Sequence, residues 1–393
     1  MARTPDTVAV VCDDQRWTYR EVNERANQLA RLLLKAGAGP EHRIALALPR
    51  SAQTITAILA VLKTGAAYVP LDHDYPQERL TYLLADSDPT ALITTTDIAT
   101  TLPTPSDADA TPRVLLDDPH TTARLRELPA TDLTLTEQTT PPDARHPAYL
   151  IYTSGSTGTP KGVTIPQTNL IHLFTATHHY FTHPTPDPTP QVWCQFHSYA
   201  FDFSVWEIFG ALLHGHTLII PNHHTTRSPH DLITLIHQQH ITTLCQTPTA
   251  LYHLINAHQH NHHAHHQPLP LQRIILGGEP LDPTRLTTFH HQHPHTTIIN
   301  MYGITETTIH ATHHTLNPNT THTPNTPSPI GHPLPHLTTH LLDTHLQPTP
   351  PNTPGELYIT GPTLARNYHN NPTLTATHFI ANPYGPPGTR LYR

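Results

Sequence analysis

Strand-like and helix-like segments alternate along the first hundred residues of the chain. VAVVCDD (8–14) has the pattern of a strand, and residues 18–37 repeat apolar side chains at helical spacing. Thr18 and Glu21 form a capping box before this helix, and Gly37 ends it. Further strands are predicted at 43–48, 67–71 and 91–95, with helices at 51–63 and within 76–86. Alternation of this kind predicts parallel sheets covered by helices.

The rest of the chain divides into three parts. Residues 96–146 are rich in Thr, Pro and Asp with little apolar periodicity, which predicts an irregular surface connection. Alternation resumes from AYLIYT (148–153) to IINMY (298–302), and short strands and turns follow after about residue 330. We therefore expect an α/β fold with two helix-flanked, mostly parallel sheets in two lobes (1–330) and an incomplete β subdomain (331–393).

Charge and cysteine content exclude several classes of protein. The formal net charge is −8 with no basic stripe, which argues against nucleic acid or an anionic membrane as the main partner. Cys12, Cys194 and Cys245 stand far apart without a CxxC pair, so neither a disulfide framework nor a structural zinc site is indicated. The chain has no run of about 18 apolar residues and no secretion signal at its start. We expect a soluble, cytoplasmic protein.

Histidine is unusually frequent, with 37 residues spread along the chain, and one stretch, HQHNHHAHH (258–266), is especially rich in it. Such a stretch contains metal-ligating side chains, but it lies in a predicted loop without fixed spacing or a supporting carboxylate. Metal sites need defined geometry as well as the right ligand type. We expect most of these histidines to be ordinary surface residues.

The segment TSGSTGTPKG (153–162) directly follows an apolar strand. Its glycines leave backbone N–H groups free to approach phosphate oxygens. It is not a Walker loop, because Pro160 and Lys161 replace the Gly-Lys pair of that pattern. A flexible linker is the alternative, but a linker would not stand between apolar strands. The segment therefore predicts a phosphate-binding loop whose hydroxyl groups and charge come from Thr153, Ser154, Ser156, Thr157 and Lys161.

This segment resembles the signature of the adenylate-forming (AMP-binding) superfamily of acyl-CoA ligases, luciferases and peptide-synthetase adenylation domains. Four more segments resemble core motifs of the amino-acid-activating branch, in the family's order. They are LKTGAAYVPLDHDYPQERL (62–80), YAFDFSVWEIFGALLHG (199–215), NMYGITETT (300–308) and GELYITGPTLARNYHNNPTLTATHF (355–379). The resemblance covers essentially the whole chain and implies the N-terminal core of a nonribosomal peptide synthetase adenylation domain, including a small β-barrel-like subdomain.

The resemblance implies a reaction. A substrate carboxylate attacks the α-phosphorus of ATP, pyrophosphate leaves, and the acyl adenylate passes to the phosphopantetheine thiol of a carrier domain. It implies catalytic roles for Thr153, Thr305 and Glu306, with Glu306 helping to hold Mg²⁺, while Tyr302 stacks on adenine and Asn300 bonds its amino edge. Each of these residues also has a purely structural interpretation when it is considered alone. Tyr302 could be a core residue, and Glu306 could be a carboxylate that is favoured at the start of a helix. The implied ATP-binding residues are Thr153, Ser154, Gly155, Ser156, Thr157, Gly158, Lys161, Gly278, Glu279, Asn300, Tyr302, Gly303 and Thr305.

Asp202 stands between two phenylalanines in an apolar segment, and a buried carboxylate without a partner is costly. In the amino-acid-activating branch, the aspartate of this FDxSVWE motif binds the substrate's α-ammonium, a charge-assisted pairing. The alternative is that Asp202 caps the helix that begins at SVWEIFGALL, and both roles are compatible.

The same resemblance implies a specificity pocket that is similar to the pattern associated with threonine. Its residues are Asp202, Phe203, Trp206, Cys245, Ile275, Gly277, Met301, Ile309 and His310. Large apolar side chains would restrict the pocket to a short substrate, and His310 could hydrogen-bond a β-hydroxyl. Cys245 departs from the pattern, since threonine pockets often carry Asn there, and a thiol is a poorer hydrogen-bond partner.

The family continues beyond RLYR (390–393) with a Thr-Gly-Asp motif and a mobile C-terminal subdomain that carries a catalytic lysine. None of Lys35, Lys63 and Lys161 lies in a matching motif, so we expect this polypeptide alone to bind ATP and substrate weakly and to turn over poorly. Two alternatives remain open. One is a related aryl- or fatty-acid ligase that uses coenzyme A, and the other is a noncatalytic nucleotide-binding module.

Overall fold

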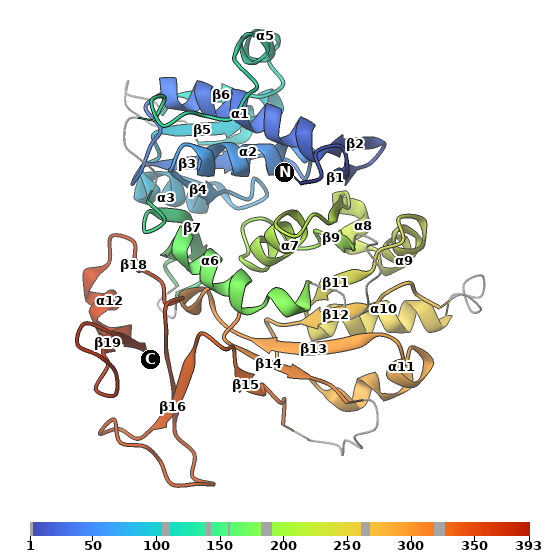
Figure 1. Ribbon diagram of the computed structural model, residues 1–393, viewed down its shortest axis with the longest axis vertical. Coiled ribbons are helices and arrows are strands. Elements are labelled where there is room, and N and C mark those ends of the chain that lie inside the picture. Colours follow the sequence, from blue (N-terminus) through green and yellow to red (C-terminus); the bar gives the residue numbers. More distant parts are fainter. Residues whose placement is uncertain are drawn as a thin grey trace.

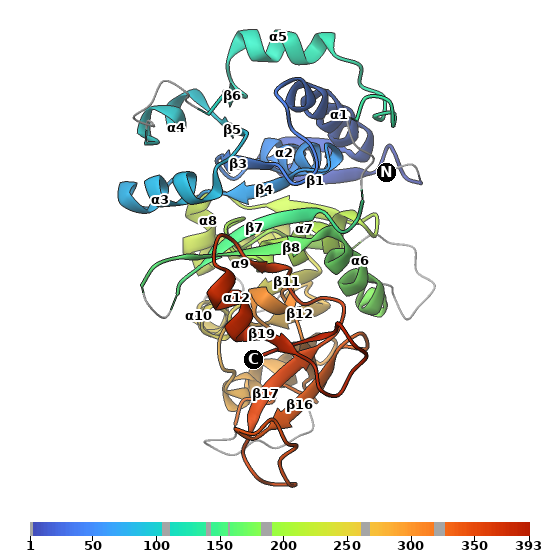
Figure 2. The ribbon, with the colours of Figure 1, turned by 90° about the vertical axis from the view of Figure 1, so that its left-hand side faces the viewer.

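The computed structural model describes residues 3–103, 111–138, 143–155, 158–181, 191–260, 268–317 and 327–393. Its strands form three sheets arranged along the long axis of the molecule (Figure 1). The helices α1 (Tyr19–Lys35) and α5 (Pro119–Glu127) lie at one end of this axis, and the smallest sheet lies at the other end in both views (Figures 1 and 2). The predicted α/β class is confirmed.

The first sheet has seven strands, and its central part is parallel. In spatial order they are β18 (Asn367–Tyr368), β8 (Lys161–Pro166), β7 (Pro147–Thr153), β4 (Ala67–Pro70), β3 (Arg43–Ala47), β5 (Ala91–Thr94) and β6 (Arg113–Leu115). Alternate residues of β3 face opposite sides, since Ile44 and Leu46 join one apolar cluster and Ala45 and Ala47 another. Helices α1 (Tyr19–Lys35) and α2 (Ala52–Lys63) cover one face, and α3 (Gln77–Ser87) covers the other.

The second sheet has nine strands with a parallel centre. In spatial order they are β15 (His332–Pro333), β14 (Thr312–Thr315), β13 (Thr297–Tyr302), β12 (Arg273–Leu276), β11 (Thr243–Gln246), β9 (Val192–Cys194), β10 (Thr217–Ile220), β1 (Val8–Cys12) and β2 (Gln15–Thr18). One face packs on helices α9 (Pro229–Gln238), α10 (Pro248–His260) and α11 (Thr287–Gln292). The other face packs on α6 (Gln167–Ala176) and α7 (Phe203–Leu212), which lie toward the first sheet. The first strand of the chain therefore pairs in parallel with β10, far from it in sequence.

The third sheet has four antiparallel strands. They are β16 (Thr338–Leu342), β17 (Glu356–Thr360), β20 (Arg390–Tyr392) and β19 (Phe379–Ala381). The remaining elements are α4 (Thr96–Thr101), α5 (Pro119–Glu127), α8 (His223–Arg227), α12 (Pro372–His378) and the 3₁₀ turns η1 (His178–Tyr180), η2 (Pro283–Leu286) and η3 (Thr305–Thr307).

The prediction of an irregular connection at 96–146 was wrong in part. The segment contains α4 and α5, and its short strand β6 extends the first sheet by pairing in parallel with β5. These elements are short and carry few apolar residues, so periodicity does not detect them. Asp118 caps α5 by accepting a hydrogen bond from the Thr121 amide.

The predicted capping box of the first long helix is confirmed. The Thr18 hydroxyl accepts a hydrogen bond from the Glu21 amide at 3.2 Å, and the Thr18 amide donates to the Glu21 carboxylate at 2.7 Å. We expect Thr18→Ala to lower the free energy of unfolding by about 1 kcal/mol, because it removes this cap. Urea unfolding measures the loss.

Thr95→Ala is the matched control, since Thr95 occupies the same position before α4 but its side chain makes no capping hydrogen bond. Thr95→Ala should lower the free energy of unfolding clearly less than Thr18→Ala does. Equal losses in the two variants would show that the capping box contributes nothing specific.

Candidate functional site

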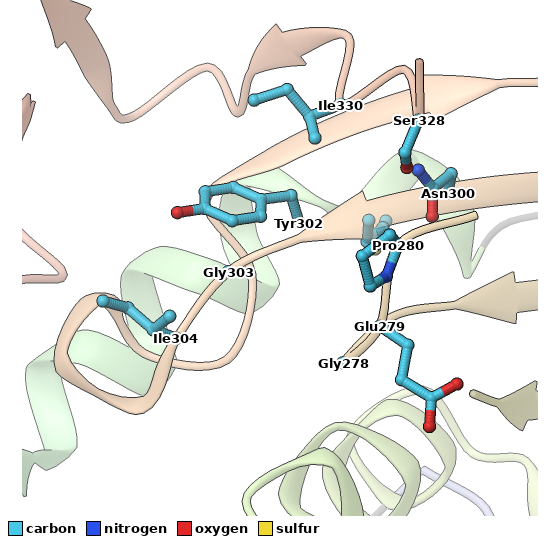
Figure 3. A pocket seen from close by; sticks show the side chains of 10 residues that line it. Gly278, Glu279, Pro280, Asn300, Tyr302, Gly303, Ile304, Ser328 and Ile330 are labelled. Carbon is cyan, nitrogen blue, oxygen red and sulfur yellow. The ribbon is translucent and has the colours of Figure 1, made fainter. Parts of the chain in front are cut away.

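A continuous cleft lies where the first and second sheets meet. Its outer part, of about 350 Å³, is lined by Gly278–Pro280, residues 300–304, Ser328 and Ile330 (Figure 3). Its inner part, of about 280 Å³, reaches from the Thr153 loop to Asp202 and His310. The two parts adjoin, since they share Gly278, Met301, Gly303 and Ile304.

The predicted phosphate-binding loop is a hairpin between two strands. Thr153 ends β7 and pairs in register with Lys161, which begins β8. Thr153, Ser154 and Lys161 line the inner cleft, and the buried hydroxyl of Thr153 has no hydrogen-bond partner within the described ranges. Gly158 has a φ of 85°, a left-handed conformation that favours glycine. Ser156 and Thr157 lie outside the described residues.

The end of β13 supplies the wall of the outer cleft. The Asn300 side chain donates from Nδ2 to the Pro329 carbonyl oxygen at 2.7 Å, which fixes its amide and leaves the carboxamide oxygen as an acceptor. Tyr302 is half-buried and lines the same space, while the side chain of Glu279 points away from the Tyr302 ring (Figure 3). The outer cleft therefore offers the Tyr302 ring beside the Asn300 carboxamide oxygen, which can accept a hydrogen bond from a ligand.

Asp202 lies at the floor of the inner cleft with 4% of its surface exposed. It precedes α7, but its side chain makes no capping hydrogen bond, so the capping alternative is wrong. Burial raises the pKa of Asp202 to about 6, although the Thr305 hydroxyl donates to the carboxylate. The Oδ2 atom has no partner among the described residues. The site therefore offers a buried anionic acceptor to a ligand.

Glu306 belongs to a cluster of four polar side chains at the junction of the three sheets. Lys161 donates from Nζ to Glu306 Oε1 at 2.6 Å, and the Tyr368 hydroxyl donates to the same oxygen at 2.7 Å. The hydroxyls of Tyr368 and Tyr392 lie 3.2 Å apart. Neither tyrosine was predicted as a site residue: Tyr368 lies within the motif at 355–379 but was given no role, and both tyrosines lie far from Glu306 along the chain.

Thr308 and Ile309 form a strained turn at the wall of the inner cleft. Thr308 and Ile309 have φ of 64° and 68°, a left-handed conformation that is rare for β-branched residues and is often found at functional sites. The Thr308 hydroxyl donates to the Thr363 carbonyl oxygen at 2.7 Å, which ties the turn to a later segment. Gly303 is required opposite it, because a Cβ there would lie 2.2 Å from the Ile309 carbonyl oxygen.

Five of the nine residues of the implied specificity pocket line the inner cleft: Asp202, Phe203, Met301, Ile309 and His310. The other four residues do not line the inner cleft: Trp206, Cys245, Ile275 and Gly277. The ring of Trp206 meets that of His310 edge-on at 4.8 Å, and Cys245 and Ile275 are register partners on β11 and β12. A Cβ on Gly277 would lie 3.4 Å from the Phe203 ring.

Two further observations concern metals and membranes. Over the residues that the structure describes, no group of three or more His, Cys, Asp or Glu side chains is placed to hold a metal ion. Only residues 258–260 of the histidine-rich stretch fall in the described part, at the end of α10. Within the same ranges, every helix is too short or too polar to span a bilayer.

Comparison with known proteins agrees with this architecture. The family model of AMP-binding enzymes matches residues 1–369. The dimodular nonribosomal peptide synthase of Bacillus subtilis is 46% identical over 394 residues, covering 100% of this chain and 16% of the relative. Malpinin synthetase of Mortierella alpina is 38% identical over 383 residues, covering 97% of this chain and 5% of the relative. This chain thus spans less than a fifth of these relatives.

Solved structures show the same fold. A nonribosomal peptide synthetase, FmoA3, superposes with a TM-score of 0.86 at 25% identity, covering 100% of this chain and 39% of that one. The N-terminal subdomain of NpsA from Klebsiella oxytoca, in complex with 3-hydroxybenzoyl-AMSN, gives a TM-score of 0.80 at 26% identity, covering 100% of this chain and 91% of that one. On its sequence and its fold, this chain belongs to the AMP-binding enzyme family and has the N-terminal core of a nonribosomal peptide synthetase adenylation domain.

Proposed function

We propose that this chain activates an amino acid by ATP-dependent adenylation for nonribosomal peptide synthesis. The observation that carries this function is the buried Asp202 carboxylate, which lines the same cleft as the Thr153 loop and has one oxygen without a hydrogen-bond partner among the described residues. An α-ammonium group is the ligand that such an acceptor favours, because a charge-assisted hydrogen bond compensates the burial of both charges. The substrate carboxylate would then lie toward the phosphate-binding loop.

The nucleotide site follows from the outer cleft and the loop. Tyr302 would stack on adenine, the Asn300 oxygen would accept from its amino group, and the backbone of Gly278 and Glu279 would lie alongside. Thr153, its loop and Thr305 would contact the phosphates. These residues act by positioning and by neutralising charge, as expected for attack on phosphorus.

The residues present also fit Mg²⁺. This ion is usually bound through one or two carboxylates together with substrate phosphates, rather than by a cage of protein ligands. Glu306 supplies one buried carboxylate at the phosphate end of the cleft. When bound there, Mg²⁺ would neutralise charge on the triphosphate.

The side-chain pocket favours threonine or a close relative. Two buried nitrogen atoms, Trp206 Nε1 and His310 Nε2, have no hydrogen-bond partner within the described part of the chain. Burial lowers the pKa of His310 to about 3, so its ring is neutral. His310 lines the inner cleft, so a β-hydroxyl there could hydrogen-bond its Nε2, whereas valine would leave this nitrogen unpaired. Burial also raises the pKa of Cys245, which stays a thiol and adds little polarity.

Downstream steps are inferred from the relatives. The aminoacyl adenylate would pass to the phosphopantetheine thiol of a carrier domain. The three cysteines are free and buried, which supports a reducing, cytoplasmic location. We also propose that residues 1–330 form two α/β lobes and that residues 331–393 contribute an incomplete β subdomain of four strands, while β15 and β18 of this segment pair within the second and first sheets.

A second candidate is activation of an aryl acid, because the structure of NpsA holds a 3-hydroxybenzoyl-AMSN ligand. Asp202 argues against it here, since an aryl acid has no cation to offer a buried carboxylate. Noncatalytic binding of nucleotide is the third possibility. ATP–pyrophosphate exchange measured with each amino acid, and with aryl acids, separates the three functions.

Asp202→Asn should weaken binding of a threonyl sulfamoyl-adenosine analogue by about 30-fold or more, because it removes the carboxylate but keeps the size of the side chain. Isothermal titration calorimetry measures the affinity. The deaminated analogue is the control and should bind the two proteins with similar affinity. An equal loss for both ligands would show that Asp202 does not recognise the ammonium group.

Affinity for the same threonyl analogue should fall on acidification. Above about pH 6 the Asp202 carboxylate is charged and can bind the ammonium. Below that value a proton competes with the ligand, and the affinity should fall by up to about tenfold per pH unit. Calorimetry from pH 7.5 to pH 5 measures this slope, and the Asp202→Asn variant should lack it. An identical slope in the variant would assign the proton to another group.

A further inference from the structure

The ammonium group of Lys161 forms an ion pair with Glu306, the carboxylate that is proposed to bind the metal. It lies 2.6 Å from Glu306 Oε1, 3.3 Å from the Tyr368 hydroxyl and 4.8 Å from the centre of the Tyr368 ring. The Glu306 side chain is 5% exposed and the Lys161 side chain 24% exposed. The anion is therefore fixed in the protein, and the cation lies at the boundary with the cleft.

The pairing has an energetic reason. A carboxylate buried without a cation is strongly unfavourable, and Asp202 adds a second negative charge nearby. Lys161 supplies the compensating charge to Glu306. A divalent cation that binds Glu306 must displace this ammonium group or share the carboxylate with it, and either event costs affinity.

The side chain of Lys161 begins next to the phosphate-binding loop as well as next to Glu306. Its backbone is the register partner of Thr153 at the base of the phosphate-binding loop, and both residues line the inner cleft. Lysine carries its charge on a flexible four-carbon stem, so the ammonium group can turn from Glu306 toward a ligand at the loop while the backbone stays fixed. A bound triphosphate offers it a new anionic partner.

We propose that Lys161 is an exchangeable counterion of Glu306, which leaves the carboxylate when Mg²⁺ and ATP bind together and then contacts the triphosphate. This inference rests on the proposed function. It explains how one buried carboxylate stays neutralised in both states. It also makes metal binding depend on nucleotide, because the metal alone gives Lys161 no new partner.

Tyr368 has a supporting role in this exchange as a positioning residue. Its hydroxyl donates to the Glu306 carboxylate independently of Lys161, and its ring lies beside the ammonium group. The backbone is fixed as well, since the Ala365 amide donates to the Glu306 carbonyl oxygen at 2.8 Å. These contacts keep the carboxylate oriented after Lys161 leaves.

The test measures binding of Mn²⁺ without nucleotide, by electron paramagnetic resonance of the free ion. Lys161→Met removes the competing charge, and we expect Mn²⁺ to bind this variant about tenfold or more tightly than the unaltered chain. Lys161→Arg keeps a cation and should restore weak binding. Lys63→Met is the matched control, since Lys63 pairs with Asp132 at 3.5 Å and does not line the cleft; it should leave Mn²⁺ binding unchanged.

Equal Mn²⁺ affinity in the unaltered chain and Lys161→Met would overturn the exchange. If Lys161→Met does not fold, as judged by thermal unfolding, Lys161→Gln serves instead, because it is neutral but retains a donor for Glu306. Glu306→Gln, measured with Mn²⁺ and the nonhydrolysable analogue AMPCPP, tests the metal assignment separately. Unchanged metal binding there would reject the metal role of Glu306 and the exchange with it, whereas the role of Asp202 would stand.

Discussion

Two carboxylates are buried on the walls of one cleft, and only Glu306 has a cation in contact with it among the described residues. Lys161 neutralises Glu306, while one oxygen of Asp202 has no partner within the described ranges and burial raises the pKa of Asp202. Burying charge is expensive, so such an imbalance persists only where the surrounding fold enforces it. Under the proposed function, a substrate ammonium group would supply the positive charge that Asp202 lacks.

The fold brings these groups together from distant parts of the chain. Lys161 begins a strand of the first sheet, Glu306 follows a strand of the second, and Tyr392 lies in the third. The cluster around Glu306 therefore connects three sheets by side-chain hydrogen bonds. A movement of one sheet relative to the others would change the contacts of the carboxylate directly, so the site depends on the assembly of the whole core.

Much of the fold was predictable because it depends on local patterns. The long helices α1 and α2 have an apolar face and capping residues, and the buried strands are rich in branched apolar residues. The elements between residues 96 and 127 were missed, since α4, α5 and β6 are short and have few apolar residues. Their stability comes from pairing and capping within the folded protein, which a periodic pattern does not show.

The residues of the candidate site were also predictable only in part from the sequence. Motif resemblance identified Thr153, Asp202 and Glu306, and the structure places all three at one cleft. It did not reveal Tyr368 and Tyr392 beside Glu306, or the left-handed turn at Thr308 and Ile309. Those features depend on contacts between residues far apart in the chain and on backbone angles that a β-branched residue rarely adopts.

The pairing of β1 with β10 has a consequence for synthesis of the protein. Val10 lies opposite Leu218, so β1 cannot pair within the second sheet until about two hundred further residues have left the ribosome. Closing so long a loop is entropically costly and slow. The hairpin of β1 and β2 would meanwhile expose apolar side chains that are buried in the folded protein, which favours non-native contacts until the central strands emerge.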